Sequence, residues 1–82
     1  MSISRTSAIE RIARVLAGRR ASANAKGDSF SAGDVVDQTW RDHLDDAASI
    51  LHTLREPDEA MAQAGDARIW QTMVETALRN GA

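Results

Sequence analysis

The chain has 82 residues, a formal net charge of −2, 43% hydrophobic residues and no cysteine. Without cysteine there are no disulfides and no thiolate metal sites, and no stretch approaches the ~18 consecutive apolar residues of a membrane span. A chain of this length buries only about 60% of the surface that its unfolded form exposes, so a lone monomer is expected to be marginally stable.

The first predicted helix covers residues 8–18. Ser7 and Glu10 have the spacing of a capping box at its start, and Gly18 is a typical helix end. Glu10 and Arg14 are four residues apart in the order that favours an ion pair on a helix. The apolar residues that should face the core are Ile9, Ile12 and Leu16.

Residues 19–30 are predicted to form a mobile linker. The stretch 19–29 carries no large apolar side chain that could hold it against a core. A connection of this length is long for a small helical domain, so we expect it to be either disordered or functional.

A long central helix is predicted over residues 32–55. Ser31 is a good N-cap, Phe30 can pack on Val35 as a hydrophobic staple, and Pro57 prevents the helix from continuing. At 1.5 Å per residue this helix would be about 36 Å long. Its buried stripe is predicted to consist of Val36, Trp40, Leu44, Ala47, Leu51 and Leu54.

Two further helices are predicted over 58–64 and 67–79. Gly65 should end the first of them at its C′ position, and Asp66 should cap the second. The core or interface residues of this region are predicted to be Met61, Trp70, Met73, Val74 and Leu78. The expected fold is therefore all-α, a small three- to four-helix bundle around one long central helix, in a single domain.

The C-terminal half carries two short motifs. Residues 55–65 read REP-x-EAM-x-x-AG, and residues 70–78 read W-x-x-M-x-x-x-AL. With these motifs the chain resembles a group of small uncharacterised helical proteins encoded in bacterial and phage genomes. The resemblance implies an all-helical fold and a bacterial or prophage origin, and it implies no activity.

Charge is distributed unevenly along the chain. Residues 1–26 hold six basic side chains and one acidic one, a net charge of +5, whereas residues 27–60 hold nine acidic and two basic ones, a net charge of −7. The residues that could contact nucleic acid or an acidic partner are Arg11, Arg14, Arg19, Arg20 and Lys26. The same charges could instead attract the acidic segment, within one chain or across a dimer. Readers of single-stranded nucleic acid interleave basic residues with aromatic ones, and this segment has no aromatic residue.

Residues that could carry out chemistry are few. His43 and Asp46 have the spacing of two metal ligands on one helix face, but no second pair of ligands matches them. Asp42, Asp45 and Asp46 form an acidic patch that we interpret as a solvated helix face. We therefore expect no catalytic residues, no metal site and no cofactor.

The function expected from the sequence is a non-catalytic protein-interaction or assembly module. A homodimer is the expected state, because one chain has a limited core and a long apolar stripe to cover. The alternative is a nucleic-acid-binding accessory protein that uses the basic N-terminal segment. The arginines among serines and alanines of residues 1–23 are also typical of a mitochondrial transit peptide, but Glu10 and the apolar stripe favour a core helix in a cytoplasmic protein, with no membrane contact.

Overall fold

The helices of this chain follow one another with short connections. The computed structural model describes residues 2–25 and 32–81, which are all-α as predicted and contain no strand. The elements are α1 (Ala8–Ala25), α2 (Ala32–Thr39), the 3₁₀ helix η1 (Trp40–His43), α3 (Leu44–Leu54), α4 (Glu59–Ala64) and α5 (Ala67–Arg79).

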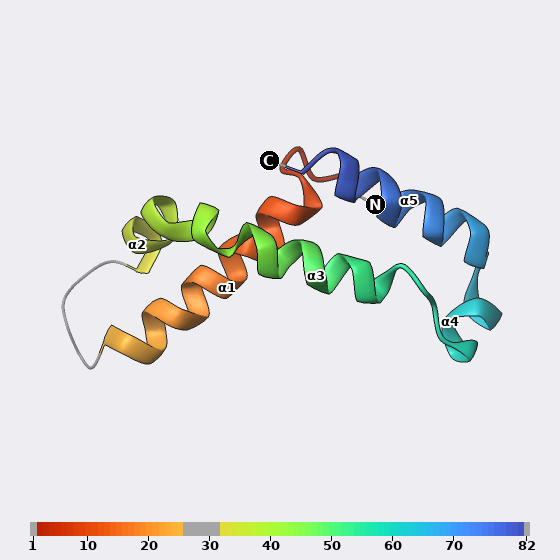
Figure 1. The fold of residues 1–82 in the computed structure, drawn as a ribbon, viewed down its shortest axis with the longest axis horizontal. Coiled ribbons are helices and arrows are strands. Elements are labelled where there is room, and N and C mark those ends of the chain that lie inside the picture. Colours follow the sequence, from red (N-terminus) through yellow and green to blue (C-terminus); the bar gives the residue numbers. More distant parts are fainter. Residues whose placement is uncertain (1, 26–31, 82) are drawn as a thin grey trace.

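α1 is the helix that organises the fold. It crosses α2, η1 and α3 and packs against all three, and it also contacts α5 (Figure 1). After α3 the chain turns at the short α4, and α5 then runs back along α3 toward the start of α1. The end of α5 lies against the start of α1, since a methyl group added at Gly81 would lie 3.3 Å from Ile9 Cδ1.

The prediction that the first helix ends at Gly18 is wrong. α1 continues through Gly18 to Ala25, so residues 19–25 are helical and do not belong to a linker. Gly18 lies where α1 passes α2, and a Cβ at this position would be 3.5 Å from Val36 Cγ2. The packing of α1 outweighs the cost of about 1 kcal/mol for a glycine inside a helix. The rest of the predicted linker, residues 26–30, lies outside the described residues, as do the predicted Ser31 cap and Phe30 staple.

The prediction of one uninterrupted helix over 32–55 is also wrong. The segment is divided at Trp40–His43, where four residues adopt 3₁₀ geometry between α2 and α3. The hydroxyl of Thr39 donates to the carbonyl of Val35 over 2.7 Å at the end of α2. Such bonds to the preceding turn often bend helices. A 3₁₀ helix rotates by 120° per residue, whereas an α-helix rotates by 100° per residue. Over the four residues of η1 this difference rotates the helix face by about 80°, so the apolar stripes of α2 and α3 do not form one continuous line.

The C-terminal helices match the predicted ranges closely. α5 covers the predicted 67–79, and Asp66 caps it by accepting from the N–H groups of Arg68 and Ile69. Asp58 caps α4 by accepting from Met61 N over 2.9 Å. The proposed role of Gly65 differs, because its backbone is extended, with φ −159°, and not left-handed. No positive φ therefore requires glycine at this position.

The core is small and contains several alanines. Its buried members are Ile9, Ala13, Ala17, Trp40, Ala47, Leu51 and Val74. Partly buried side chains that pack around them are Ile12, Val36, Leu44, Ala48, Trp70, Ala77 and Leu78. Alanine at a helix crossing lets two backbones approach closely, which explains why α1 can contact three successive elements at once.

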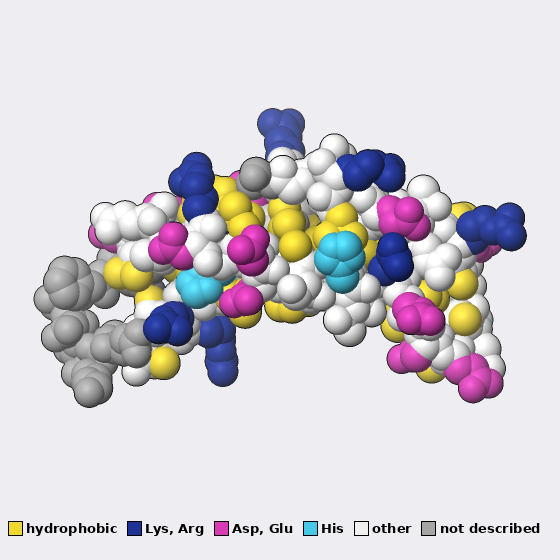
Figure 2. All heavy atoms as spheres, in the orientation of Figure 1, with side chains coloured by type: hydrophobic (Ala, Val, Ile, Leu, Met, Phe, Trp, Pro, Cys, Tyr) yellow, Lys and Arg dark blue, Asp and Glu magenta, His cyan; other side chains and the backbone are white. Residues whose placement is uncertain are grey.

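The molecule is elongated. Its principal extents are 46 × 27 × 24 Å, and its radius of gyration is 15.1 Å, compared with about 12 Å expected for a compact chain of this length. On the face drawn in Figure 2, hydrophobic side chains remain visible along one edge of α3 and around α4. Much of the apolar surface is therefore not covered within one chain.

Candidate interaction surface

One of the predicted basic contact residues is used inside the fold. Arg14 Nε donates to Glu10 Oε2 over 2.8 Å, which is the predicted i,i+4 pair, and Arg14 Nη1 donates to Asp37 Oδ1 over 2.7 Å. The second bond joins α1 to α2. The hydrogen bond to Asp37 has the larger effect on the pKa of the Arg14 guanidinium, and the hydrogen bond to Glu10 has the next largest. Both raise this pKa above its ordinary value, because the two carboxylates favour the charged form.

The same arginine helps to cover the buried indole of Trp40. The guanidinium carbons of Arg14 and Arg41 lie 5.2 Å and 4.4 Å from the ring centroid, which are cation–π distances. Trp40 itself is only 4% exposed. Part of the basic charge near the N-terminus therefore stabilises the crossing of α1 with α2 and η1.

The other basic candidates remain on the surface. Arg11, Arg19 and Arg20 are exposed on α1, which carries them on one rigid element because the helix does not end at Gly18. Arg20 lies nine positions after Arg11, which is about 14 Å along the helix axis. Lys26 lies outside the described residues.

The histidine and the acidic patch lie close together in the sequence at the junction of η1 and α3. His43 is half-buried at the end of η1, and Asp42, Asp45 and Asp46 are all exposed. Among residues 2–25 and 32–81, no three His, Asp or Glu side chains are placed so that they could hold a metal ion. η1 and the first turn of α3 thus present carboxylates to solvent.

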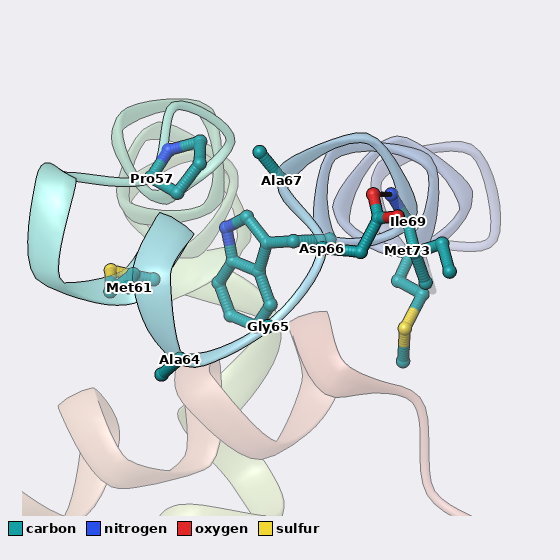
Figure 3. A pocket seen from close by; sticks show the side chains of 9 residues that line it. Pro57, Met61, Ala64, Gly65, Asp66, Ala67, Ile69 and Met73 are labelled. Carbon is teal, nitrogen blue, oxygen red and sulfur yellow. Dashed lines mark hydrogen bonds between the residues drawn. The ribbon is translucent and has the colours of Figure 1, made fainter.

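An apolar groove lies between α4 and α5 at the C-terminal end of the described chain. Its volume is about 330 Å³, and it is lined by Pro57, Met61, Ala64, Gly65, Asp66, Ala67, Ile69, Trp70 and Met73. Figure 3 shows Pro57 and Met61 on the α4 side of the groove and Ile69 and Met73 on the α5 side. The wall on the α5 side is open to solvent, since Ile69 is 59% exposed and Met73 is 61% exposed.

Local chemistry explains why the groove exists. Asp58 caps α4 and Asp66 caps α5, and Gly65 between the two helices has an extended backbone, so the chain does not continue from α4 into α5 as one helix. Trp70 lines the groove, and its Nε1–H donates to the carbonyl oxygen of Leu54 over 2.7 Å. This bond satisfies a carbonyl at the end of α3, which has no partner within its own helix.

The predicted core or interface residues divide into two groups. The structure buries Ile9, Trp40, Ala47, Leu51 and Val74 and half-buries Ile12, Leu16, Val36, Leu44, Trp70 and Leu78. It leaves Leu54, Met61 and Met73 exposed. Sequence reasoning missed Ala17 as a core residue and Ile69 as a surface one. The sequence does contain a signal for the exposure of Ile69. Ile69 and Met73 are four residues apart and share a helix face, and this face is about a third of a turn away from the core stripe of α5.

Comparison of this chain with known proteins does not place it in a family. No protein-family model, curated protein sequence or solved structure matches this chain significantly. None of the helices in the described ranges has the length and apolar character needed to cross a membrane.

Proposed function

We propose that this protein is a non-catalytic interaction or assembly module that self-associates, with a homodimer as its working state. The observation that carries this proposal is the exposed area. The chain exposes 6422 Å², whereas a compact monomer of 8.9 kDa is expected to expose about 4,800 Å². The excess of about 1,600 Å² exceeds the ~800 Å² that each partner contributes to a standard protein–protein interface.

The limited core supports the same proposal. Among the residues whose burial the structure describes, three of the seven buried ones are alanines, so few large side chains there leave water when one chain folds. Each exposed methionine, leucine or isoleucine that a partner covers contributes about 1.5–3 kcal/mol when its burial is complete. A second copy would therefore supply apolar burial that the single chain lacks.

The setting of this module is also a proposal. The motifs at residues 55–65 and 70–78 support a bacterial or prophage origin, as the resemblance implies. We propose a cytoplasmic location, in which a small helical assembly protein without cysteine needs no disulfide.

Light scattering coupled to size exclusion tests self-association. We expect the measured mass to rise from that of one chain, 8.9 kDa, toward twice that value as the concentration passes through the micromolar range. A folded chain whose mass stays that of a monomer at submillimolar concentration would rule the proposal out. Circular dichroism of the same samples establishes that the chain is helical.

Nucleic-acid binding is the second candidate function. The observation that favours it is the continuous α1, which carries the exposed Arg11, Arg19 and Arg20 on one helix. A fluorescence-anisotropy titration at low salt would then give binding that weakens as salt is added. The double variant Arg19→Ala, Arg20→Ala should lose it, and the matched change Arg68→Ala on α5 should not. Absence of binding at low salt would reject this function.

A further inference from the structure

We infer that the outer face of α1 binds the phosphate backbone of duplex nucleic acid. This outer face consists of Arg11, Val15, Arg19 and Ser22, all of which are exposed. The inference rests on the second candidate function, nucleic-acid binding, and assigns its surface and its kind of ligand. Since α1 packs on α2, η1 and α3 with its other side, the surface is formed before any ligand arrives.

The outer face lies opposite the buried side of α1. At 100° per residue, Arg11 and Arg19 each lie about 40° from Val15, one on either flank. Ala13 and Ala17, which are buried, lie about 160° from Val15 on the side that packs on the rest of the fold. Val15 itself is 63% exposed. The two arginines therefore reach into solvent on the same side of the helix.

Positive charge on the outer face is not neutralised within the described part of the chain. Both ion pairs among residues 2–25 and 32–81 involve Arg14, and neither involves Arg11 or Arg19. Glu10 is the one acidic residue of α1. It lies about 140° from Val15 around the helix and accepts from Arg14 over 2.8 Å. The outer face thus carries charge of one sign, which complements a polyanion.

Part of the acidic charge of the chain lies far from this face. Figure 1 places α4 and the end of α1 at opposite ends of the molecule, which is 46 Å long. Glu56, Asp58 and Glu59 lie in α4 or directly before it. At 0.1 M ionic strength, exposed charges are screened over about 10 Å. These carboxylates therefore do not repel a polyanion that is held by the outer face.

The composition of the outer face fits a phosphate backbone better than a protein surface. Of the residue types that protein–protein interfaces favour, chiefly aromatic residues, methionine and arginine, it has only arginine. Ser22 and Ala23, of types that such interfaces avoid, line a shallow depression beside Arg19 together with Val15 and Gly18. Small side chains let a ligand approach closely, and arginine and serine both donate to phosphate oxygens.

The spacing of the arginines fits a duplex. Arg11 and Arg19 are eight positions apart, which is about 12 Å along the helix axis. The major groove of B-DNA is also about 12 Å wide, with a row of phosphates on each side. With α1 lying across the groove, each arginine can reach a phosphate of a different strand. A single strand fits less well, because its binding proteins stack bases on aromatic side chains and the outer face has none.

Fluorescence anisotropy with a short labelled DNA duplex of mixed sequence tests the surface. Arg11→Ala and Arg19→Ala should each weaken binding and lower the slope of log K against log salt by about 0.9, the value for one lost phosphate contact. Arg20→Ala is the matched control. It removes the same charge from an exposed position of the same helix, about 140° from Val15, and should leave the slope unchanged. Equal changes in the three variants would overturn the assigned face.

Substitutions at Val15, in the middle of the outer face, test whether charge carries the binding. Val15→Glu should abolish binding at low salt, and Val15→Lys should strengthen it, because the side chain lies between the two arginines. Both variants should fold, since this side chain is exposed, and circular dichroism checks that they are helical. Equal weakening by glutamate and lysine would overturn the electrostatic contact.

Two other polyanions test the kind of ligand. The labelled duplex should bind more tightly than a single strand of the same length, and poly-glutamate of equal total charge should not displace it. Tighter binding of the single strand, or equal competition by poly-glutamate, would overturn the assignment to a duplex phosphate backbone.

The failure of this inference can be distinguished from the failure of the second candidate function. If the unchanged protein binds the duplex and Arg20→Ala loses as much affinity as Arg19→Ala, the outer face is wrong and nucleic-acid binding stands on another surface. If the unchanged protein binds neither duplex nor single strand at low salt, both are wrong.

Discussion

Arg14 and Asp37 are 23 residues apart in the sequence, yet the guanidinium of Arg14 donates to the carboxylate of Asp37 over 2.7 Å. This bond is the ion pair that links α1 to α2. The same guanidinium holds Glu10 and lies over the ring of Trp40. One arginine thus connects the start of α1 with α2 and the 3₁₀ segment.

Replacing Asp37 by asparagine should lower the thermal unfolding midpoint, because Arg14 loses its link to α2. The loss should be modest, since the pair is close to solvent, and it should shrink when salt is added. Differential scanning fluorimetry at low and high salt measures both effects. Glu75→Gln, at an exposed position inside α5, is the matched control and should leave the midpoint nearly unchanged.

Gly18→Ala should raise the free energy of unfolding by about 0.5–1 kcal/mol, because alanine favours a helix interior over glycine. The added methyl group would meet Val36 Cγ2 at 3.5 Å, an ordinary contact distance. Urea denaturation followed by circular dichroism gives the value. A loss of stability would mean that α1 and α2 cannot accept a methyl group between them.

Ala13→Leu should destabilise the protein by about 1–3 kcal/mol, because the larger side chain overpacks the crossing of α1 with its neighbours. Ala13 is completely buried, whereas Val15 on the same helix is 63% exposed. Val15→Leu is therefore the control, and it should change the unfolding free energy by less than about 0.5 kcal/mol. Similar effects of the two variants would contradict the observed packing.

Trp70→Phe should cost about 0.5–1.5 kcal/mol of stability, because it removes the hydrogen bond from Nε1 to Leu54 O. The variant also leaves Trp40 as the sole fluorophore. Since that indole is buried, its emission should be quenched by acrylamide less strongly than the emission of Trp70 in a Trp40→Phe variant. Equal quenching of the two single-tryptophan variants would contradict this difference in burial.

The features predicted correctly from the sequence are those set by local chemistry. Asp66 and Ser7 cap helices with their own side chains, and Glu10 N donates to Ser7 Oγ over 3.2 Å. Such bonds span two or three residues, so the sequence alone determines them. The range of α5 follows from its cap and its apolar period, and both are visible in the sequence.

The features predicted wrongly depend on contacts between distant residues. Gly18 was expected to end a helix on its intrinsic preference, but the packing of α1 against Val36 overrides that preference. No glycine or proline marks Trp40–His43, where the backbone tightens as the indole enters the crossing with α1. The groove between α4 and α5 was not predicted. Met61 and Met73 were expected in the core or in an interface, and their exposure depends on how α4 is placed against α5.

The arrangement of α1 has a consequence for synthesis on the ribosome. Its buried alanines, Ala13 and Ala17, lie in a helix whose main packing partners span residues 32–54 and are therefore translated later. A nascent chain stalled before Trp40 carries an amphipathic helix with no docking partner, and most of the stability of a helix in a protein comes from the packing of its apolar face. Protease protection of α1 in stalled complexes should begin only after α3 has left the exit tunnel.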